Sequence, residues 1–237
     1  MSSALEFRTG TQVDAAVVDS FLLNHFRVTE PITSALGATM DDVTDFFCDL
    51  RDGGLHHEKH SILVFDEDQL VAISLNDVKE FSNPSTSNTG EFNPYHDYAE
   101  DIAKGPYSQL NANRLVTFVE TLEQGMQQLL GNPTHVLKID VLCVRNDYQG
   151  RGIASQLVRR SIDHAENTSC SWVVTAATAV ASQIVFAKAG FRTIHELPFS
   201  CFREDGECVY RCLPDHGRCG KLMAIPVESR NAVQNVK

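Results

Sequence analysis

The segment that most constrains this chain is a strand, turn and helix between residues 141 and 165. The apolar run Val141–Val144 predicts a buried strand, and the polar stretch Arg145–Tyr148 predicts a turn. A helix follows Gly150 and Gly152, and its apolar residues recur at helical spacing. Glycines at a helix start let the backbone approach a ligand, and the unpaired N–H groups there suit a diphosphate. The segment therefore predicts an anion-binding helix start.

A glycine pair before a helix does not by itself select a ligand, because tight strand-to-helix turns also use glycine. The dinucleotide-binding fingerprint requires three glycines early in a βαβ unit, followed by an acidic residue about twenty positions on. Only Gly150 and Gly152 are present here, late in the chain, and the lysine of a Walker A loop is missing. The pattern therefore argues against both of these nucleotide-binding classes.

Two motifs resemble the GNAT superfamily of N-acetyltransferases. The segment Gln149–Ala154 matches the acetyl-CoA pyrophosphate loop of that superfamily, Gln/Arg-x-x-Gly-x-Gly/Ala, and Ala181–Phe191 resembles its next helix with the Gly-Phe ending. The resemblance implies an α/β fold in which a mixed sheet of about seven strands, flanked by helices, is splayed between strands 4 and 5. It also implies one domain over residues 1–237, with a polar loop excursion at about 81–108.

Acetyl-CoA is the co-substrate that this resemblance implies, with no metal. Its thioester would lie between the splayed strands Lys138–Val144 and Trp172–Ala177, with the pyrophosphate on the helix start. Arg145, Arg151 and Lys188 are the nearest cations for its phosphates, which a chain of formal charge −11 must hold locally. The cofactor-binding residues implied are Leu142, Cys143, Val144, Gln149, Gly150, Arg151, Gly152, Ile153, Ala154, Ser155, Ser182 and Lys188.

The junction Asn24–Ile32 carries a narrower resemblance, to the invertebrate-type arylalkylamine N-acetyltransferases. In that family a helix ends in Phe and is followed by Glu-Pro-Leu/Ile, whose glutamate is proposed as general base; Glu30 and Pro31 match it. A carboxylate whose pKa is raised by burial can deprotonate an ammonium group. The resemblance therefore implies transfer of an acetyl group to dopamine, serotonin, octopamine, tyramine or tryptamine, by direct attack in a ternary complex.

Two hydroxyl groups follow the second splayed strand, at Thr178 and Ser182. The resembled family has two serines there that assist the glutamate, so Thr178 is expected to contact the substrate together with Glu30 and Pro31. Ser182 either protonates the departing thiolate or caps its helix. Cys143 as an acyl-carrying nucleophile is the competing mechanism, although no histidine lies near it in the sequence.

Other functions stay open at this point. The same fold could acetylate a polyamine, an amino acid or a protein amine, or it could be a catalytically silent acyl-CoA-binding module. Aromatic residues in the polar excursion, Phe92, Tyr95, Tyr98 and Tyr107, either stack on a substrate ring or anchor the loop.

Composition bounds the remaining classes. The net charge of −11 and the absence of a basic stripe argue against nucleic acid and leave cationic small molecules as natural substrates. No apolar run has the length of a membrane span and no signal peptide is visible, so we expect a cytoplasmic, monomeric protein without a membrane partner. The odd number of cysteines, seven, favours reduced thiols. A zinc site is a weaker alternative for Cys201, Cys208, Cys212, His216 and Cys219, which lack short Cys-x-x-Cys spacing.

Periodicity and turn signals place the other elements. Expected strands are 4–8, 61–65, 69–75, 136–144, 172–177, 191–197 and 218–227. Expected helices are a long one ending near Glu30, because Pro31 follows, then 41–53, 110–130 and 180–189. His56, His57 and His60 are expected to be exposed.

Overall fold

The computed structural model describes residues 4–81 and 93–227, and its centre is a mixed seven-stranded sheet. The order of the strands is β1-β2-β3-β4-β5-β9-β6, and β4 and β5 are the parallel pair among antiparallel neighbours. This arrangement confirms the predicted fold class. The strands are β1 Glu6–Thr9, β2 Ile62–Asp66, β3 Gln69–Glu80, β4 His135–Val144, β5 Trp172–Ala177, β6 Arg192–Pro198 and β9 Cys219–Pro226, with a separate short hairpin of β7 Arg203–Glu204 and β8 Glu207–Cys208.

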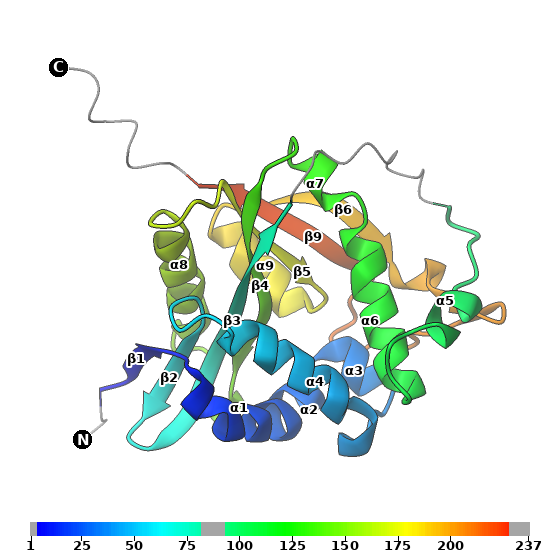
Figure 1. The fold of residues 1–237 in the computed structure, drawn as a ribbon. Helices are drawn as coiled ribbons and strands as arrows, with labels where there is room; N and C mark the ends of the chain where they lie inside the picture. Colours follow the sequence, from blue (N-terminus) through cyan, green and yellow to red (C-terminus); the bar gives the residue numbers. More distant parts are fainter. Residues whose placement is uncertain (1–3, 82–92, 228–237) are drawn as a thin grey trace.

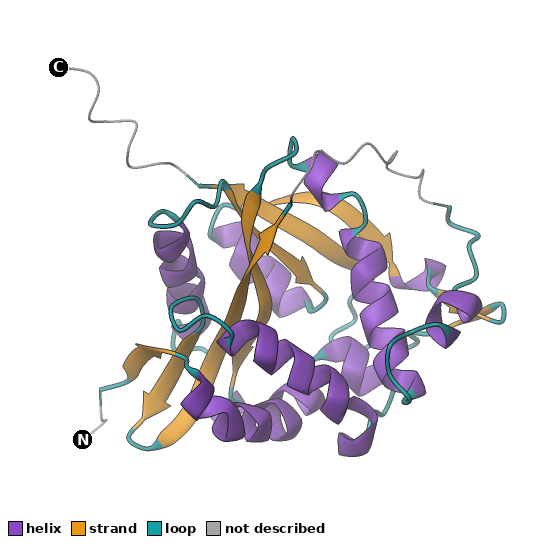
Figure 2. Cartoon of the chain, in the orientation of Figure 1, coloured by secondary structure: helices purple, strands orange, loops and turns teal. Residues whose placement is uncertain are grey.

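Helices cover both faces of the sheet (Figure 1, Figure 2). On one face α4 packs on β3, and α6 packs on β5, β6 and β9; on the other, α8 packs on β3, β4 and β5, next to α9. No helix among the described residues is long and apolar enough to span a membrane. The helices are α1 Ala15–Phe21, α2 Arg27–Thr29, α3 Pro31–Ala35, α4 Met40–Leu55, α5 Ala99–Ala103, α6 Leu110–Glu123, α7 Met126–Leu129, α8 Ile153–Ala165 and α9 Val180–Lys188, with single turns η1 Gln12–Asp14, η3 Asn146–Tyr148 and η4 Phe199–Cys201.

The sheet opens between its two parallel strands. β4 and β5 pair at Val136–Lys138 with Trp172–Val174 and then part, β4 continuing along β3 and β5 along β9. Thr175 donates its hydroxyl proton to the Ile139 carbonyl at 3.0 Å, at the first position beyond the pairing. The carboxyl ends of these strands therefore border a gap, which is where open α/β sheets bind ligands.

The N-terminal helical region places Glu30 at this gap. α1 continues through a π-helical turn, η2 Leu22–Phe26, into α2, and the run ends where Glu30 takes an extended conformation (ψ 122°). Pro31 then starts α3, for which proline's fixed φ is suited. The predicted end of the long helix near Glu30 is confirmed, with its cause in the proline that follows.

Several predicted boundaries were wrong. The helix expected at 110–130 is two helices, because Gln124 leaves the helical conformation (ψ 128°) and Gly125 adopts a left-handed conformation (φ 74°) between α6 and α7. β3 runs on to Glu80 rather than ending at residue 75. The polar excursion at about 81–108 includes one short helix, α5, among its described residues. Phe92 and the rest of 82–92 lie outside the described residues.

One histidine expected to be exposed, in the turn between α4 and β2, contacts a histidine of α8. His56 and His57 are exposed, but His60 is half-buried, and its Nδ1 lies 2.8 Å from Nε2 of His164 on α8. Burial lowers the pKa of both rings from the ordinary 6.5, and the positive charge of Lys59 lowers that of His164 further. The contact therefore requires at least one neutral imidazole.

This histidine pair predicts a loss of stability in mild acid. The unfolded chain protonates first as pH falls below 6.5, so stability present above that pH is lost as it falls toward the lower folded-state pKa values. The melting temperature of the wild-type protein should therefore fall more between pH 7.5 and 5.5 than that of a His60→Asn/His164→Gln variant. Equal losses in both proteins, measured by circular dichroism, would remove the pair from the acid response.

Candidate active site

Two cavities meet at Glu30. The first, of about 420 Å³, runs between the parted strands to the start of α8, and the second, of about 340 Å³, lies among α4, α6 and β4. Five residues line both cavities: Phe26, Glu30, Asp140, Ala176 and Thr178. A molecule in one cavity can therefore meet a molecule in the other beside the Glu30 carboxylate.

The first cavity brings together most of the residues predicted to bind a phosphorylated cofactor. Leu142, Cys143 and Val144 border it from β4, and Ser182 borders it from α9. Its far end is lined by Gln149, Gly150, Gly152, Ile153, Ala154 and Ser155. Residues more than thirty positions apart thus form one wall, because α8 and α9 follow the two parted strands.

The start of α8 is open to an anion. Gly150 and Gly152 are left-handed (φ 74° and 75°), and a Cβ added to either would meet no atom within 4 Å. No side chain caps this thirteen-residue helix, so its first backbone N–H groups point into the space around the loop. These residues fit a pyrophosphate, which such a helix start attracts through its N–H groups and its dipole.

None of the three cationic side chains predicted to bind phosphates lines the first cavity. Arg145 is bound to Asp147, with Nε 2.7 Å from Oδ1, and stacks on Tyr148. Arg151 also lies over the Tyr148 ring, outside the cavity lining, and Lys188 is exposed at the end of α9 and does not line the cavity. The backbone at the helix start is therefore the part of this site whose geometry fits a diphosphate most directly.

Glu30 is buried and holds four hydrogen bonds. Its Oε1 accepts from the Thr178 hydroxyl at 2.7 Å and from the Ile32 N–H at 3.3 Å. Its Oε2 accepts from the Thr33 hydroxyl at 2.6 Å and the Thr33 N–H at 2.7 Å. Burial raises the pKa of Glu30 above the ordinary 4.5, and the hydrogen bonds from Thr33 and Thr178 oppose that rise. The result is an oriented carboxylate with more affinity for a proton than an exposed one.

Ser182 lies in the first cavity with its hydroxyl directed back to its own helix. Its Oγ donates to the Ala179 carbonyl at 2.8 Å, and no side chain of the helix itself caps α9. The first N–H of α9, that of Val180, is instead bound by Asp215 Oδ2 at 2.8 Å. Asp215, rather than Ser182, therefore binds the free N–H group at the start of α9.

Cys143 lines the cavity as a protonated thiol. It is buried, and burial together with the charge of Glu30 raises its pKa to about 12. Its near neighbour is the Thr29 hydroxyl, at 4.0 Å from Sγ. The thiolate that covalent catalysis requires is thus disfavoured here.

The second cavity adds residues that sequence reasoning missed. Asp140 is on β4, beside Lys138, which pairs with Asp140 at 2.8 Å and with Glu123 at 2.6 Å. In the sequence, Lys138 and Asp140 stand out as charged residues within the otherwise apolar run of β4, and this was the signal that could have found them. Thr33, three residues after Glu30 at a helix start, was a second one, because a residue at that position can bond to the cap. Pro31 does not line either cavity but sets the backbone that positions Glu30.

The cysteines of the C-terminal region do not gather into a metal site. Among the residues that the structure describes, no group of three or more His, Cys, Asp or Glu side chains could hold a metal ion. Cys201, Cys208, Cys212 and Cys219 are free. Cys208 donates to the carbonyls of Phe199 and Tyr210 at 3.3 Å each.

Comparison with known proteins identifies the family. A family model described as an acetyltransferase (GNAT) domain matches residues 80–200, more than half of the chain. The chain therefore belongs to the GNAT acetyltransferase family, whose domains use acetyl-CoA. No curated protein matches the sequence.

Solved structures share the fold at low identity. Arylalkylamine N-acetyltransferase 2 from Aedes aegypti is similar with a TM-score of 0.75 and 16% identity, over 95% of this chain and 100% of that one. The polyamine N-acetyltransferase of Drosophila melanogaster, which forms N-acetylagmatine, has a TM-score of 0.70 and 17% identity, over 94% and 100%. The C-terminal condensation domain of Ebony, solved with β-alanyl-dopamine, has a TM-score of 0.68 and 15% identity, over 95% and 100%. These likenesses show the fold, and the names of these proteins refer to different small molecules.

Replacing Gly152, which is left-handed, can distinguish an effect on ligand binding from an effect on folding. Gly152→Ala is expected to cost about 1–2 kcal/mol of stability from backbone strain and to weaken CoA binding further, because the new Cβ occupies the helix start. Gly206→Ala is the matched control, since Gly206 is also left-handed (φ 80°) with open space around it, in the β7–β8 hairpin. Calorimetry should show weaker CoA binding for Gly152→Ala alone. Equal CoA affinities would contradict a phosphate site at the start of α8.

The high pKa of the Cys143 thiol predicts that replacing this residue changes the rate of acetyl transfer little. Cys143→Ala is expected to keep acetyl transfer within about threefold of wild type, because its pKa of about 12 leaves almost no thiolate at neutral pH. Steady-state rates with saturating acetyl-CoA check this. A loss of a hundredfold or more with an unchanged melting temperature would restore Cys143 as a nucleophile.

Proposed function

We propose that this protein is an acetyl-CoA-dependent N-acetyltransferase that acts on a small primary amine by direct attack, with Glu30 as general base. The observation that carries the proposal is the meeting of the two cavities at the buried Glu30 carboxylate. One cavity fits the donor and the other is left for the acceptor. Holding both reactants in one complex lowers the barrier by about 7–11 kcal/mol in well-oriented systems.

The donor side follows from the parted strands. Backbone groups of Leu142, Cys143 and Val144 border the first cavity beyond the β4–β5 pairing, where a pantetheine arm can add to the strand edge. The helix start at Gly152 would hold the pyrophosphate. Acetyl-CoA, when bound, supplies the activated acetyl group as a thioester.

The acceptor must lose a proton before its nitrogen is nucleophilic. The raised pKa of Glu30 brings its proton affinity closer to that of the ammonium, and the carboxylate is held in one orientation by Thr33 and Thr178. Glu30 takes the proton, directly or through a water, and the nitrogen attacks the thioester carbonyl carbon. The C–S bond then breaks and the thiolate leaves, and the second proton that the nitrogen loses as the amide forms neutralises the thiolate.

Two hydroxyl groups lie near the reacting centre in this scheme. Thr178 fixes Oε1 of Glu30 through its 2.7 Å hydrogen bond, so its role is to position the base. Ser182 lines the donor cavity and is our candidate to donate a proton to the departing thiolate. In its present orientation that hydroxyl proton goes to the Ala179 carbonyl, so a rotation about χ1 must precede the donation.

Arylalkylamines such as dopamine, serotonin, octopamine, tyramine and tryptamine are the acceptors that the sequence resemblance favours. Phe26, Phe46 and aliphatic side chains of α6 line the second cavity and give it an apolar part, which is the support for this candidate. A polyamine or a guanidino amine is the second candidate, and the carboxylates of the same cavity support it. Both candidates are small cations that the acidic chain, at −11, attracts.

Substitution of the base tests the proposal. Glu30→Gln should lower kcat by about 10²–10⁴ and abolish the acidic limb of the pH profile of kcat/KM. In the wild-type enzyme that limb should lie above the ordinary carboxyl value of 4.5, because only the ionised carboxylate accepts a proton. Rates from thiol release across pH 5–9 check this.

Thr178→Val is the partner variant for that experiment. It removes one hydrogen bond that lowers the pKa of Glu30, so the acidic limb should move to higher pH while turnover persists. A Glu30→Gln profile identical to wild type would remove Glu30 from the base role. A wild-type protein that binds CoA but acetylates no amine would identify a silent binding module.

A further inference from the structure

The second cavity is strongly acidic. Its lining includes six carboxylates, Glu30, Asp49, Asp77, Glu120, Glu123 and Asp140. The lysines in the same lining are Lys79 and Lys138. One carboxylate is enough to deprotonate an amine, so the other five require another explanation.

Both lysines are already bound to carboxylates of the cavity. Lys79 Nζ lies 2.8 Å from Asp77, and Lys138 Nζ lies 2.6 Å from Glu123 and 2.8 Å from Asp140. Together they offset at most two of the negative charges. The excess negative charge therefore persists in the cavity.

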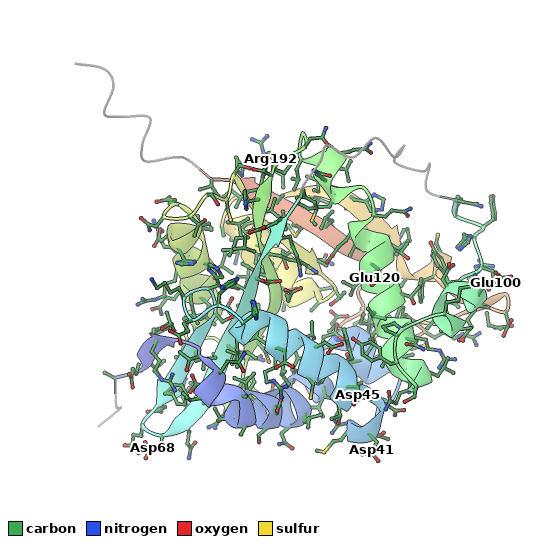
Figure 3. The ribbon with its side chains drawn as sticks, viewed as in Figure 1. Asp41, Asp45, Asp68, Glu100, Glu120 and Arg192 are labelled. Carbon is green, nitrogen blue, oxygen red and sulfur yellow. The ribbon has the colours of Figure 1, made fainter. Side chains whose placement is uncertain are left out.

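Asp49 and Glu120 form the part of the lining without a cationic partner. Asp49 is on α4 and Glu120 on α6, two helices that pack on each other; Figure 3 labels Glu120 on α6. Within residues 4–81 and 93–227, no lysine, arginine or histidine forms an ion pair with either of them. They present negative charge on two facing walls.

The charge on Asp49 is held in place. The Tyr107 hydroxyl donates to Asp49 Oδ2 at 2.7 Å, and burial and the nearby acids raise the pKa of Tyr107, so the phenol keeps its proton. A protonated phenol orients the carboxylate and leaves its negative charge intact. Its other oxygen stays available to a ligand.

The aromatic residues of the second cavity offer little free surface on which a substrate ring could stack. Phe26 and Phe46 are the aromatic residues of the lining, and both rings already pack on Phe47, at 5.5 and 5.9 Å between centroids. Asp49 and Glu120 are exposed, and a neutral ring placed between α4 and α6 would cover part of their surface without supplying a compensating charge, which is unfavourable. A cation there would satisfy them.

We propose that the preferred acceptor is an aliphatic amine with a second cationic group, an amine or a guanidinium. Its reacting amine lies at Glu30, and its distal cation is bound between α4 and α6 by Asp49 and Glu120. This inference rests on the proposed acetyl transfer and names the acceptor class within it.

Matched acceptors test the distal charge. The full-length protein is assayed for thiol release from acetyl-CoA with 1,4-diaminobutane and agmatine, and with butylamine, tyramine and tryptamine as acceptors of a single charge. The kcat/KM of the dications should exceed that of butylamine and of the aryl amines by about tenfold, because the distal cation meets two exposed carboxylates that a singly charged acceptor leaves unused.

Variants locate the charge. Asp49→Asn and Glu120→Gln should each lower kcat/KM for 1,4-diaminobutane about threefold, mainly through KM, because both carboxylates are exposed and screened. Neither should change kcat/KM for butylamine by more than about twofold. Asp45→Asn is the control, because Asp45 is also on α4 but does not line the cavity, and its Oδ2 is bound by the Gln109 amide. It should leave both acceptors unchanged.

The possible outcomes separate this inference from the proposed function. Aryl amines acetylated as well as or better than the dications would overturn the second cation and leave acetyl transfer standing. Equal losses for butylamine and 1,4-diaminobutane in Asp49→Asn and Glu120→Gln would overturn the distal site. Acetylation of no amine would overturn both proposals.

Discussion

The parting of β4 from β5 is the constraint on which the rest of this structure depends. Two parallel strands that stop pairing after Lys138 and Val174 leave β4 with β3 on one side and no partner strand on the β5 side. The molecule lines that gap with a helix on each side, α8 after β4 and α9 after β5 (Figure 1). The same gap gives the first cavity its walls, and the start of α8 gives it a place for an anion.

Glu30 closes the gap from the opposite face of the sheet. The N-terminal helical run ends at Thr29, because Pro31 follows Glu30. The extended conformation of Glu30 turns its side chain so that it caps α3. The cap bonds, with Thr178 from the end of β5, hold the carboxylate where both cavities meet. A residue that would ordinarily serve only as a helix cap is thereby also buried, with its pKa raised. The carboxylate oxygens that cap α3 are therefore the same atoms that would accept the proton of the amine.

The sequence predicted the parts of this arrangement that depend on local chemistry. Gly150 and Gly152, the apolar strand before them and the Glu30-Pro31 junction each have a short-range cause, whereas the fold class was implied by the resemblance to the GNAT superfamily. Long-range contacts could not be predicted in that way. The His60–His164 contact joins residues 104 positions apart, and the charge of the second cavity comes from α4, α6, β3 and β4 together. The break of the 110–130 helix at Gly125 was within reach, because glycine is a common helix-ending residue.

The central claim is that acceptor and donor occupy adjoining cavities at the same time, with transfer in one step beside Glu30. Initial rates measured over a grid of acetyl-CoA and 1,4-diaminobutane concentrations, or tyramine if that is the better acceptor, test it most directly. The structure predicts intersecting lines in double-reciprocal plots, as for a ternary complex. Parallel lines, with an acetylated enzyme trapped in the absence of amine, would show a covalent intermediate and contradict direct attack.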